Sequence, residues 1–260
     1  MTWRAALKSA LVATGLAGPA FRLREWMQAR SAKPEPSPDG LPVPPPYLIQ
    51  VIVGYTHAQW YADSGAMVAT AFTALFNEAG IDFANAQRVL DFGCGAGRVA
   101  RQMPRHTKAQ LFGVDINPAL VRWCAQNLAG TFTRNRLHPP LDFPDAHFDA
   151  IYALSVFTHL RRETQDDWLA ELHRVLKPGG AALITFHDEF QPKRPDVAEK
   201  LASQPFRVEN DTLEGSNLMA TFQTWAETRA RFSRLFDIAA ERRSADAPFQ
   251  QAAAVLRKRQ

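Results

Sequence analysis

The sequence predicts an α/β fold built on a parallel β-sheet, and three observations support this prediction. Residues 88–91 form a short apolar run that ends in Asp91, which is typical of a buried strand. A glycine-rich turn follows at once, and the chain has a helical pattern from Val99 onward. Residues 110–114 form a second apolar run that ends in another acid, Asp115. At 260 residues and 29.0 kDa, one α/β domain with additions is the simplest organisation.

The turn after the first strand contains the residues expected to bind a ligand. Glycines let the backbone turn tightly and allow a ligand to lie against bare main chain. The first N–H groups of the following helix would point to the same place. Strand, glycine turn and helix start together are typical of a nucleotide-binding βαβ unit. We therefore expect a ligand to contact Gly93, Gly95 and Gly97, with Cys94 as a small residue filling the turn.

The spacing of the glycines argues against a dinucleotide. The dinucleotide pattern is Gly-x-Gly-x-x-Gly, whereas here the third glycine comes one residue early, at Gly97, and Arg98 stands in the expected position. The carboxylate of Asp91 would repel a pyrophosphate but would suit a ligand that carries an ammonium group. An NAD-dependent oxidoreductase is thus an alternative that the spacing disfavours.

Asp115 is the predicted ribose ligand. It lies 24 residues after Asp91, close to the interval at which a βαβ unit places an acid beside a ribose. A carboxylate can accept hydrogen bonds from both ribose hydroxyls, and no arginine follows to bind a 2′-phosphate. Asn117 and Pro118 suit the cap and first turn of the next helix.

The remaining elements follow from local patterns. A helix is expected over residues 66–79, with Ser64-Gly65 breaking the chain ahead of it. Strands are expected at residues 131–134, 148–154 and 181–186, and Thr164 is expected to cap the helix between the last two. Thr224 and Glu227 have capping-box spacing for a helix that runs to Phe232. Residues 236–242 and 252–257 have the pattern of two terminal strands.

Three stretches carry a resemblance to a known family. The run Asp-x-Gly-x-Gly-x-Gly from Asp91 resembles motif I of the class I S-adenosylmethionine-dependent methyltransferases. Residues 141–160 resemble the stretch through motif IV in the subgroup that includes many small-molecule enzymes, and residues 171–180 are a third match. The resemblance covers about residues 47–260. It implies a Rossmann-like, seven-stranded, mostly parallel sheet with helices on both faces and an antiparallel C-terminal hairpin.

The resemblance also implies S-adenosyl-L-methionine as cofactor, with S-adenosyl-L-homocysteine as product, and it assigns further residues to the site. Ile116 would lie against the adenine, and Asn135 or the backbone near Leu137 is the nearest candidate to bind its amino group. Leu154 and Ser155 stand at the carboxyl end of the fourth strand, where open α/β sheets bind ligands. Residues expected on the acceptor side are Phe157, Thr158 and His159, followed more weakly by His187 and Asp188.

His159 is the candidate general base, because an imidazole with a pKa near 6.5 suits proton removal at neutral pH. The predicted reaction moves a methyl group by in-line displacement to an O or N atom of a small-molecule or glycan-like acceptor. A noncatalytic methyltransferase-like binding scaffold is the second alternative.

Charge and proline content predict the domain organisation. Residues 1–33 contain six Lys or Arg and one Glu, which predicts a basic helical arm able to contact an anionic membrane surface weakly. Residues 34–46 contain seven prolines and form a linker. The resemblance implies a methyltransferase domain over residues 47–260, with lid helices at 47–87, and the polar, proline-containing residues 189–219 are expected to form an irregular acceptor-side insertion. Candidate pocket residues ahead of the first strand are Tyr55, His57, Trp60 and Tyr61.

Composition excludes several other classes of protein. The net charge of +4 is concentrated in residues 1–33, so a broad nucleic-acid groove is not expected. Cys94 and Cys124 give neither a disulfide framework nor metal-ligand spacing, so no metal is predicted. No apolar run approaches the roughly 18–20 residues that span a bilayer. A cytoplasmic location is therefore expected, with peripheral contact at the inner membrane surface as a further expectation.

Overall fold

The computed structural model describes residues 37–54, 56–191 and 194–260. The predicted basic arm at residues 1–33, the first three linker residues and Tyr55 lie outside the described residues. The chain divides into two compact units, residues 1–62 and 63–260. In the described part of the chain, no helix combines the length and the apolar character needed to cross a membrane.

The first unit contains a short helix, α3 (Pro46–Val53), and the start of α4 (Ala58–Glu78). Helix α3 begins at a proline and ends at Gly54, whose φ of 75° is left-handed. Proline suits the first helical turn because its missing N–H has no partner there in any case. Leu48 and Ile49 are buried.

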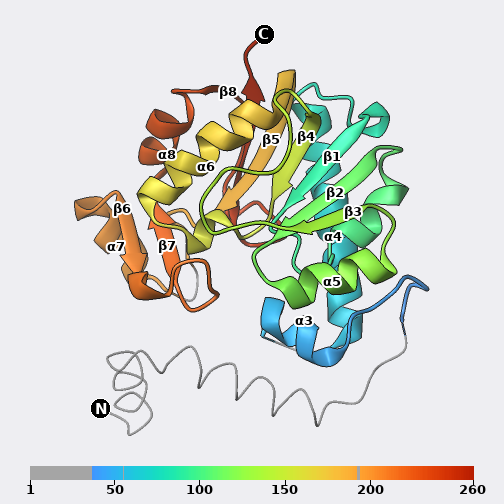
Figure 1. Ribbon diagram of the computed structural model, residues 1–260. Coiled ribbons are helices and arrows are strands. Elements are labelled where there is room, and N and C mark those ends of the chain that lie inside the picture. Colours follow the sequence, from blue (N-terminus) through green and yellow to red (C-terminus); the bar gives the residue numbers. More distant parts are fainter. Residues whose placement is uncertain (1–36, 55, 192–193) are drawn as a thin grey trace, which may run out of the picture. The chain divides into compact units, whose positions relative to one another are not determined.

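The second unit contains the predicted seven-stranded sheet, with strand order β3-β2-β1-β4-β5-β9-β8 (Figure 1). The strands are β1 (Arg88–Phe92), β2 (Gln110–Asp115), β3 (Thr131–Arg134), β4 (Phe148–Ala153), β5 (Leu176–Phe186), β8 (Phe236–Arg242) and β9 (Ala252–Lys258). Strands β1 to β5 pair in parallel, while β9 is antiparallel to both β5 and β8. The predicted mostly parallel sheet with an antiparallel C-terminal hairpin is confirmed.

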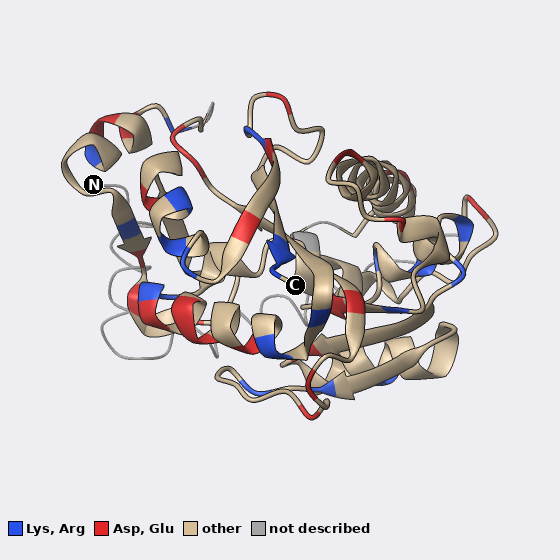
Figure 2. Cartoon of the chain, turned by 90° about the horizontal axis from the view of Figure 1, so that it is seen from above, with Lys and Arg blue, Asp and Glu red and all other residues tan. Residues whose placement is uncertain are grey.

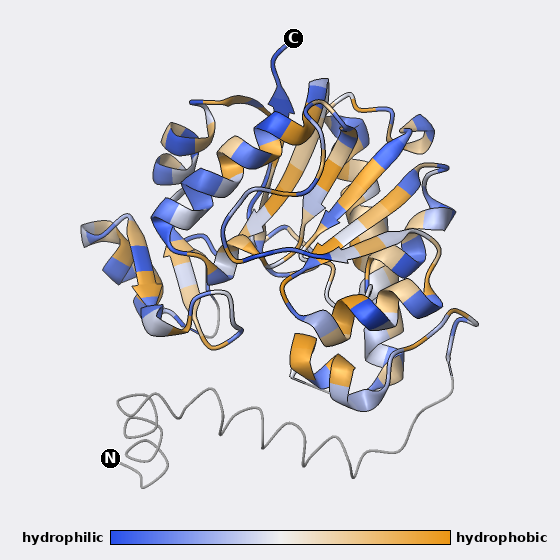
Figure 3. Cartoon of the chain, in the orientation of Figure 1, coloured by the Kyte–Doolittle hydropathy of each residue, from blue (hydrophilic) through white to orange (hydrophobic). Residues whose placement is uncertain are grey.

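Alternate residues of each strand pack on opposite faces of the sheet, because side chains along a strand point to alternate sides. On one face, Leu90 and Phe92 pack with residues of α6 (Arg162–Val175) and α8 (Trp225–Phe232). On the other face, Val89 packs with residues of α4 and with Phe83 in η1 (Phe83–Asn85). Helices thus cover both faces of the sheet, and the central strands are largely apolar (Figure 3). Charged residues lie mostly on the surrounding helices and loops (Figure 2).

Several boundaries differ from the expectation, for local reasons. The helix expected from Val99 is only a six-residue 3-10 helix, η2 (Ala100–Arg105), which contains Pro104. Proline lacks the N–H that an α-helix needs. Helix α6 begins two residues before Thr164, which is buried within its first turn and does not cap it. The caps at Asn117 and Thr224 are confirmed: Asn117 accepts from Ala119 N at the start of α5 (Pro118–Asn127), and Thr224 accepts from Glu227 N.

The insertion at residues 189–219 is structured, although it was expected to be irregular. It contains α7 (Asp196–Ser203), β6 (Phe206–Glu209) and the 3-10 turn η4 (Asp211–Leu213). Strand β6 pairs with β7 (Ala220–Gln223) in a separate two-stranded antiparallel sheet. Arg194 stabilises this part by pairing with both Asp196 and Glu209. The prolines and polar residues of the segment give no local signal of this structure, which is stabilised by ion pairs and a small apolar cluster.

Gly65 lies inside α4 and does not break the chain ahead of a helix. A Cβ on Gly65 would stand 2.3 Å from the carbonyl oxygen of Arg98, so the absence of a side chain lets α4 approach the segment after the glycine turn. The Arg98 guanidinium also donates to Ser64 Oγ at 3.1 Å. The glycine therefore marks a close helix contact.

We predict that Gly65→Ala destabilises the protein by about 1–3 kcal/mol through overpacking. At an ordinary exposed helix position the same change would stabilise by about 1 kcal/mol. Thr70→Ala, at an exposed position of α4, is the matched control and should change the free energy of unfolding by less than about 0.5 kcal/mol. Urea unfolding measures both variants, and a Gly65→Ala protein as stable as the wild type would contradict the close contact.

Candidate cofactor site

The glycine turn is fastened to the end of the neighbouring strand. The backbone N–H groups of Gly93 and Cys94 both donate to the carbonyl oxygen of Val114, at 2.8 and 2.9 Å. Gly93 has a φ of 80°, and a Cβ there would lie 2.2 Å from Cγ2 of Val156. Gly97, with a φ of 76°, packs as closely against Leu128. The turn needs glycine at these positions both for the left-handed backbone and for the contacts.

Asp91 is a buried carboxyl group beside the turn. Its residue is 4% exposed, and burial raises its pKa to about 8. The neighbouring Tyr152 hydroxyl lowers this pKa and the charge of Asp115 raises it, while Arg98 lowers it slightly. A cation placed at this carboxyl would favour its ionised form. The chemistry of Asp91 therefore suits an ammonium group.

Asp115 ends β2 and is fastened to the same turn. One carboxylate oxygen accepts from Gly95 N at 2.9 Å, and the other accepts from Asn117 N at 2.8 Å. Burial raises the pKa of Asp115, and the two backbone hydrogen bonds oppose that shift. Each carboxylate oxygen has a second lone pair, so the group can still accept from two ribose hydroxyls.

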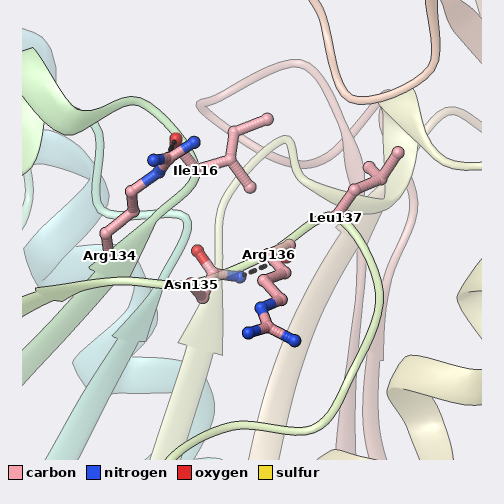
Figure 4. Close-up of a pocket in the computed structure, with 5 residues that line it drawn as sticks. All are labelled: Ile116, Arg134, Asn135, Arg136 and Leu137. Atoms are coloured by element: carbon pink, nitrogen blue, oxygen red, sulfur yellow. Dashed lines mark hydrogen bonds between the residues drawn. The ribbon is translucent and has the colours of Figure 1, made fainter.

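A pocket lies directly beyond Asp115. It has a volume of about 520 Å³ and is lined by Ile116, Arg134, Asn135, Arg136 and Leu137 (Figure 4). The side-chain N–H of Asn135 donates to the Arg136 carbonyl at 3.0 Å, whereas its Oδ1 is enclosed and has no hydrogen-bond partner. An enclosed acceptor without a partner is costly, and an amino group in this pocket would satisfy it once the Asn135 side chain rotates toward the opening. Arg134 donates to the carbonyl oxygen of Ile116 at 3.1 Å, a placement that the sequence did not indicate.

Two predicted cofactor residues have other partners. Cys94 is 5% exposed and its thiol lies against Gly95 O, in an apolar cluster with Cys124. Ser155 has a left-handed φ of 60°, and its hydroxyl accepts from Gln251 Nε2 at 2.7 Å. Its backbone N–H donates to Thr185 Oγ1 at 2.8 Å. The Ser155 hydroxyl is therefore hydrogen-bonded to another residue of the protein. Gln251 positions it, a role that the sequence did not indicate.

His159 lies in η3 (Phe157–His159), just after β4. Its Nδ1 is 2.6 Å from the carbonyl oxygen of Met219, and burial lowers its pKa. The imidazole is thus neutral at pH 7, as a base requires.

The insertion links the cofactor pocket to His159. Gly215 N donates to the His159 carbonyl at 2.9 Å, and the backbone N–H of Arg161 donates to Glu214 Oε1 at 2.8 Å. A Cβ on Gly215 would lie 2.7 Å from Leu137 Cδ1 and 3.3 Å from Ile116 Cδ1. The loop between β6 and β7 therefore covers two residues of the pocket and holds the candidate base.

The structure brings together most of the predicted cofactor residues in the second unit. His57, Trp60 and Tyr61 belong to the first unit, so their contribution to the pocket stays a prediction. Among the described residues, no group of three or more His, Cys, Asp or Glu could hold a metal ion.

Comparisons with known proteins agree with this fold. Residues 89–180 match the family model described as "Methyltransferase domain". A sterol 24-C-methyltransferase of Yarrowia lipolytica is 32% identical over 123 residues, which cover 42% of this chain and 32% of that protein. A fatty-acid O-methyltransferase of Mycolicibacterium smegmatis is 32% identical over 127 residues, covering 47% of this chain and 44% of that protein. The chain spans about a third to a half of the length of these relatives.

Solved structures show the same fold. The 1,6-didemethyltoxoflavin-N1-methyltransferase of Burkholderia thailandensis, with S-adenosylhomocysteine bound, superimposes with a TM-score of 0.57 at 17% identity over 84% of this chain and 92% of that one. A SAM-dependent methyltransferase of Methanosarcina mazei gives a TM-score of 0.55 at 17% identity, covering 69% and 95% of the two chains. The family match covers residues 89–180, and the solved structures share the fold of the whole sheet. The resemblance seen in the motifs is confirmed.

We predict that Gly93→Ala destabilises the protein by about 1–3 kcal/mol, since it adds a clash and a strained backbone. Val156→Ala removes the atom that the new Cβ would meet. The double variant should therefore recover part of the loss, which a double-mutant cycle measured by urea unfolding would detect as coupling of at least about 0.5 kcal/mol. Strictly additive effects would show that the Gly93–Val156 contact does not restrict this position.

Proposed function

We propose that this protein is an S-adenosyl-L-methionine-dependent methyltransferase acting on a small-molecule acceptor. The observation that supports this most directly is the arrangement of Asp91, Asp115 and the Ile116–Asn135 pocket around one glycine turn. An ammonium group, a ribose diol and an adenine need these three kinds of partner in this order. When bound, the cofactor supplies an electrophilic methyl group on sulfur.

The residues of the chain have separate roles in this proposal. Asp91 pairs with the ammonium group of the cofactor, and Asp115 accepts from its ribose hydroxyls. After rotation of its enclosed side chain, Asn135 Oδ1 accepts from the adenine amino group, between the apolar side chains of Ile116 and Leu137. Gly93, Cys94, Gly95 and Gly97 form the turn against which the cofactor lies, and Leu154 and Ser155 form the edge at the end of β4.

Positioning is the main contribution expected of such an enzyme, because a neutral thioether leaves and no strong charge develops on it. The acceptor is the less defined part of the proposal. Relatives are named for sterol carbon, fatty-acid oxygen and other O-methyl transfer, and a structural neighbour is named for N1 of a toxoflavin precursor. We infer a small-molecule acceptor that reacts at an O or N atom, with His159 as the base that removes a proton from it.

Titration calorimetry with S-adenosylhomocysteine and with NAD tests the proposed cofactor. We expect S-adenosylhomocysteine to bind and NAD not to bind. Asp115→Ala should weaken binding of the nucleoside about 10- to 100-fold, because charge-assisted hydrogen bonds are lost. Asp237→Ala removes an exposed carboxylate of β8 that pairs with Arg259. This variant should leave the affinity unchanged. NAD binding without nucleoside binding would overturn the proposal.

The pKa of Asp91 predicts a pH dependence of cofactor affinity. In the free protein this carboxyl keeps its proton up to pH about 8, whereas pairing with an ammonium group requires the ionised form. Binding must therefore release a proton, and the affinity for S-adenosylhomocysteine should rise about tenfold per pH unit between about pH 6 and 7.5.

Two controls isolate the amino-acid tail. 5′-Deoxy-5′-methylthioadenosine has the same adenine, ribose and thioether but no ammonium group, so its affinity should stay constant over this pH range. Asp91→Asn should bind S-adenosylhomocysteine weakly and without the pH dependence. Equal pH dependence for both ligands would show that another group is titrating.

A further inference from the structure

Two imidazoles stand at adjacent strand ends and are held in the same way. His159 follows β4 and His187 follows β5, and these strands are parallel neighbours. Nδ1 of His159 lies 2.6 Å from the Met219 carbonyl, and Nδ1 of His187 lies 3.2 Å from the Thr221 carbonyl. The two carbonyls are two residues apart along the chain entering β7, which corresponds to about 7 Å in extended backbone.

The anchoring fixes the tautomer of both rings. A carbonyl oxygen only accepts hydrogen bonds, so each Nδ1 must carry the proton and each Nε2 must present a lone pair. Within residues 37–54, 56–191 and 194–260, no hydrogen bond engages either Nε2, and neither atom is among the enclosed polar atoms that lack a partner. Neither lone pair is therefore used by the described part of the protein.

Neither ring forms an ion pair with any residue that the structure describes. Burial lowers the pKa of both imidazoles, and the nearby charge of His159 lowers that of His187 further, to about 4. The neighbouring Asp188 carboxylate is occupied by Trp225 Nε1 and by Ser244 N, both at 3.1 Å. The His187 ring stacks on Phe222 with ring centroids 5.2 Å apart.

A site with two Nε2 acceptors favours ligands that carry hydrogen-bond donors. A carboxylate has no proton to donate to Nε2, and the Asp188 carboxylate beside His187 already accepts from Trp225 and Ser244 rather than from a ligand. An uncharged molecule with O–H donors and an apolar body satisfies both lone pairs and the aromatic wall.

We propose that His159 and His187 together form the acceptor-binding end of the site, and that its substrates are uncharged, partly apolar molecules carrying at least two hydroxyl groups. This inference rests on the proposed function. The hydroxyl at His159 is the reacting group: its O–H bond breaks, the electron pair stays on oxygen, and the proton moves to Nε2 of His159. His187 accepts from the second hydroxyl and orients the molecule.

Nuclear magnetic resonance of the protein with ¹⁵N-labelled histidine tests this assignment. The probe is resorcinol, an uncharged ring with two hydroxyls, and its dimethyl ether is the control without donors. With S-adenosylhomocysteine present at pH 7.5, we expect the Nε2 signals of both histidines to move on adding resorcinol and to stay unchanged with the ether. His187→Asn keeps an N–H for the Thr221 carbonyl but lacks the Nε2 acceptor, so it should bind resorcinol about tenfold more weakly.

Four results would overturn the proposal: a protonated Nε2 on either ring, an unchanged spectrum with resorcinol, equal shifts with the ether, or a response of His159 alone. Zinc that stays bound in stoichiometric amounts after dialysis, and is lost in His187→Asn, would also overturn it by making the pair a metal site. The resorcinol titration is repeated without S-adenosylhomocysteine. If the nucleoside itself fails to bind, the proposed function fails, while the tautomers and the resorcinol response still decide the role of the pair.

Discussion

The attachment of the glycine turn to the end of β2 is the constraint on which the rest of the site depends. Val114 receives two N–H groups from the turn at its carbonyl, and Asp115 receives a third from Gly95. These bonds join β1 and β2 at their carboxyl ends and place the two acids beside the same turn. Because Asp115 serves both the turn and the predicted ribose contact, the site is already shaped before a ligand arrives. Preorganisation of this kind lowers the free-energy cost of binding.

The electrostatics of this edge follow from placing two carboxyl groups in one buried region. Burial and the charge of Asp115 together raise the pKa of Asp91 to about 8. A cationic ligand reverses this penalty, because it favours the ionised carboxylate. The enclosed Oδ1 of Asn135 is a second unmet requirement, for a hydrogen-bond donor. Both features cost stability in the free protein, and the proposed cofactor, with an ammonium group at one end and an amino-substituted base at the other, carries a partner for each.

The insertion between β5 and α8 connects the two ends of the site. Its loop contacts Ile116 and Leu137 through Gly215, and the same loop and β7 supply the carbonyls that hold His159 and His187. A change in the loop would therefore reach both the pocket and the two imidazoles. Variable loops on a rigid sheet commonly carry specificity, and here the loop acts through the tautomer and orientation of the histidines as well as through its own side chains.

Local sequence patterns determined the sheet, the caps at Asn117 and Thr224, and the two acids at strand ends, since these depend on residues close in the chain. The motif resemblance also predicted the methyltransferase-domain model that residues 89–180 match. Contacts between distant residues determined the rest. Gly65 has the local pattern of a helix breaker, yet it belongs to α4 because its missing side chain admits Arg98. The use of Ser155 by Gln251, 96 residues away, and the anchoring of His159 by Met219, 60 residues away, have no local signal. Hydrogen-bond partners of this kind exist only once the sheet has brought the strand ends together.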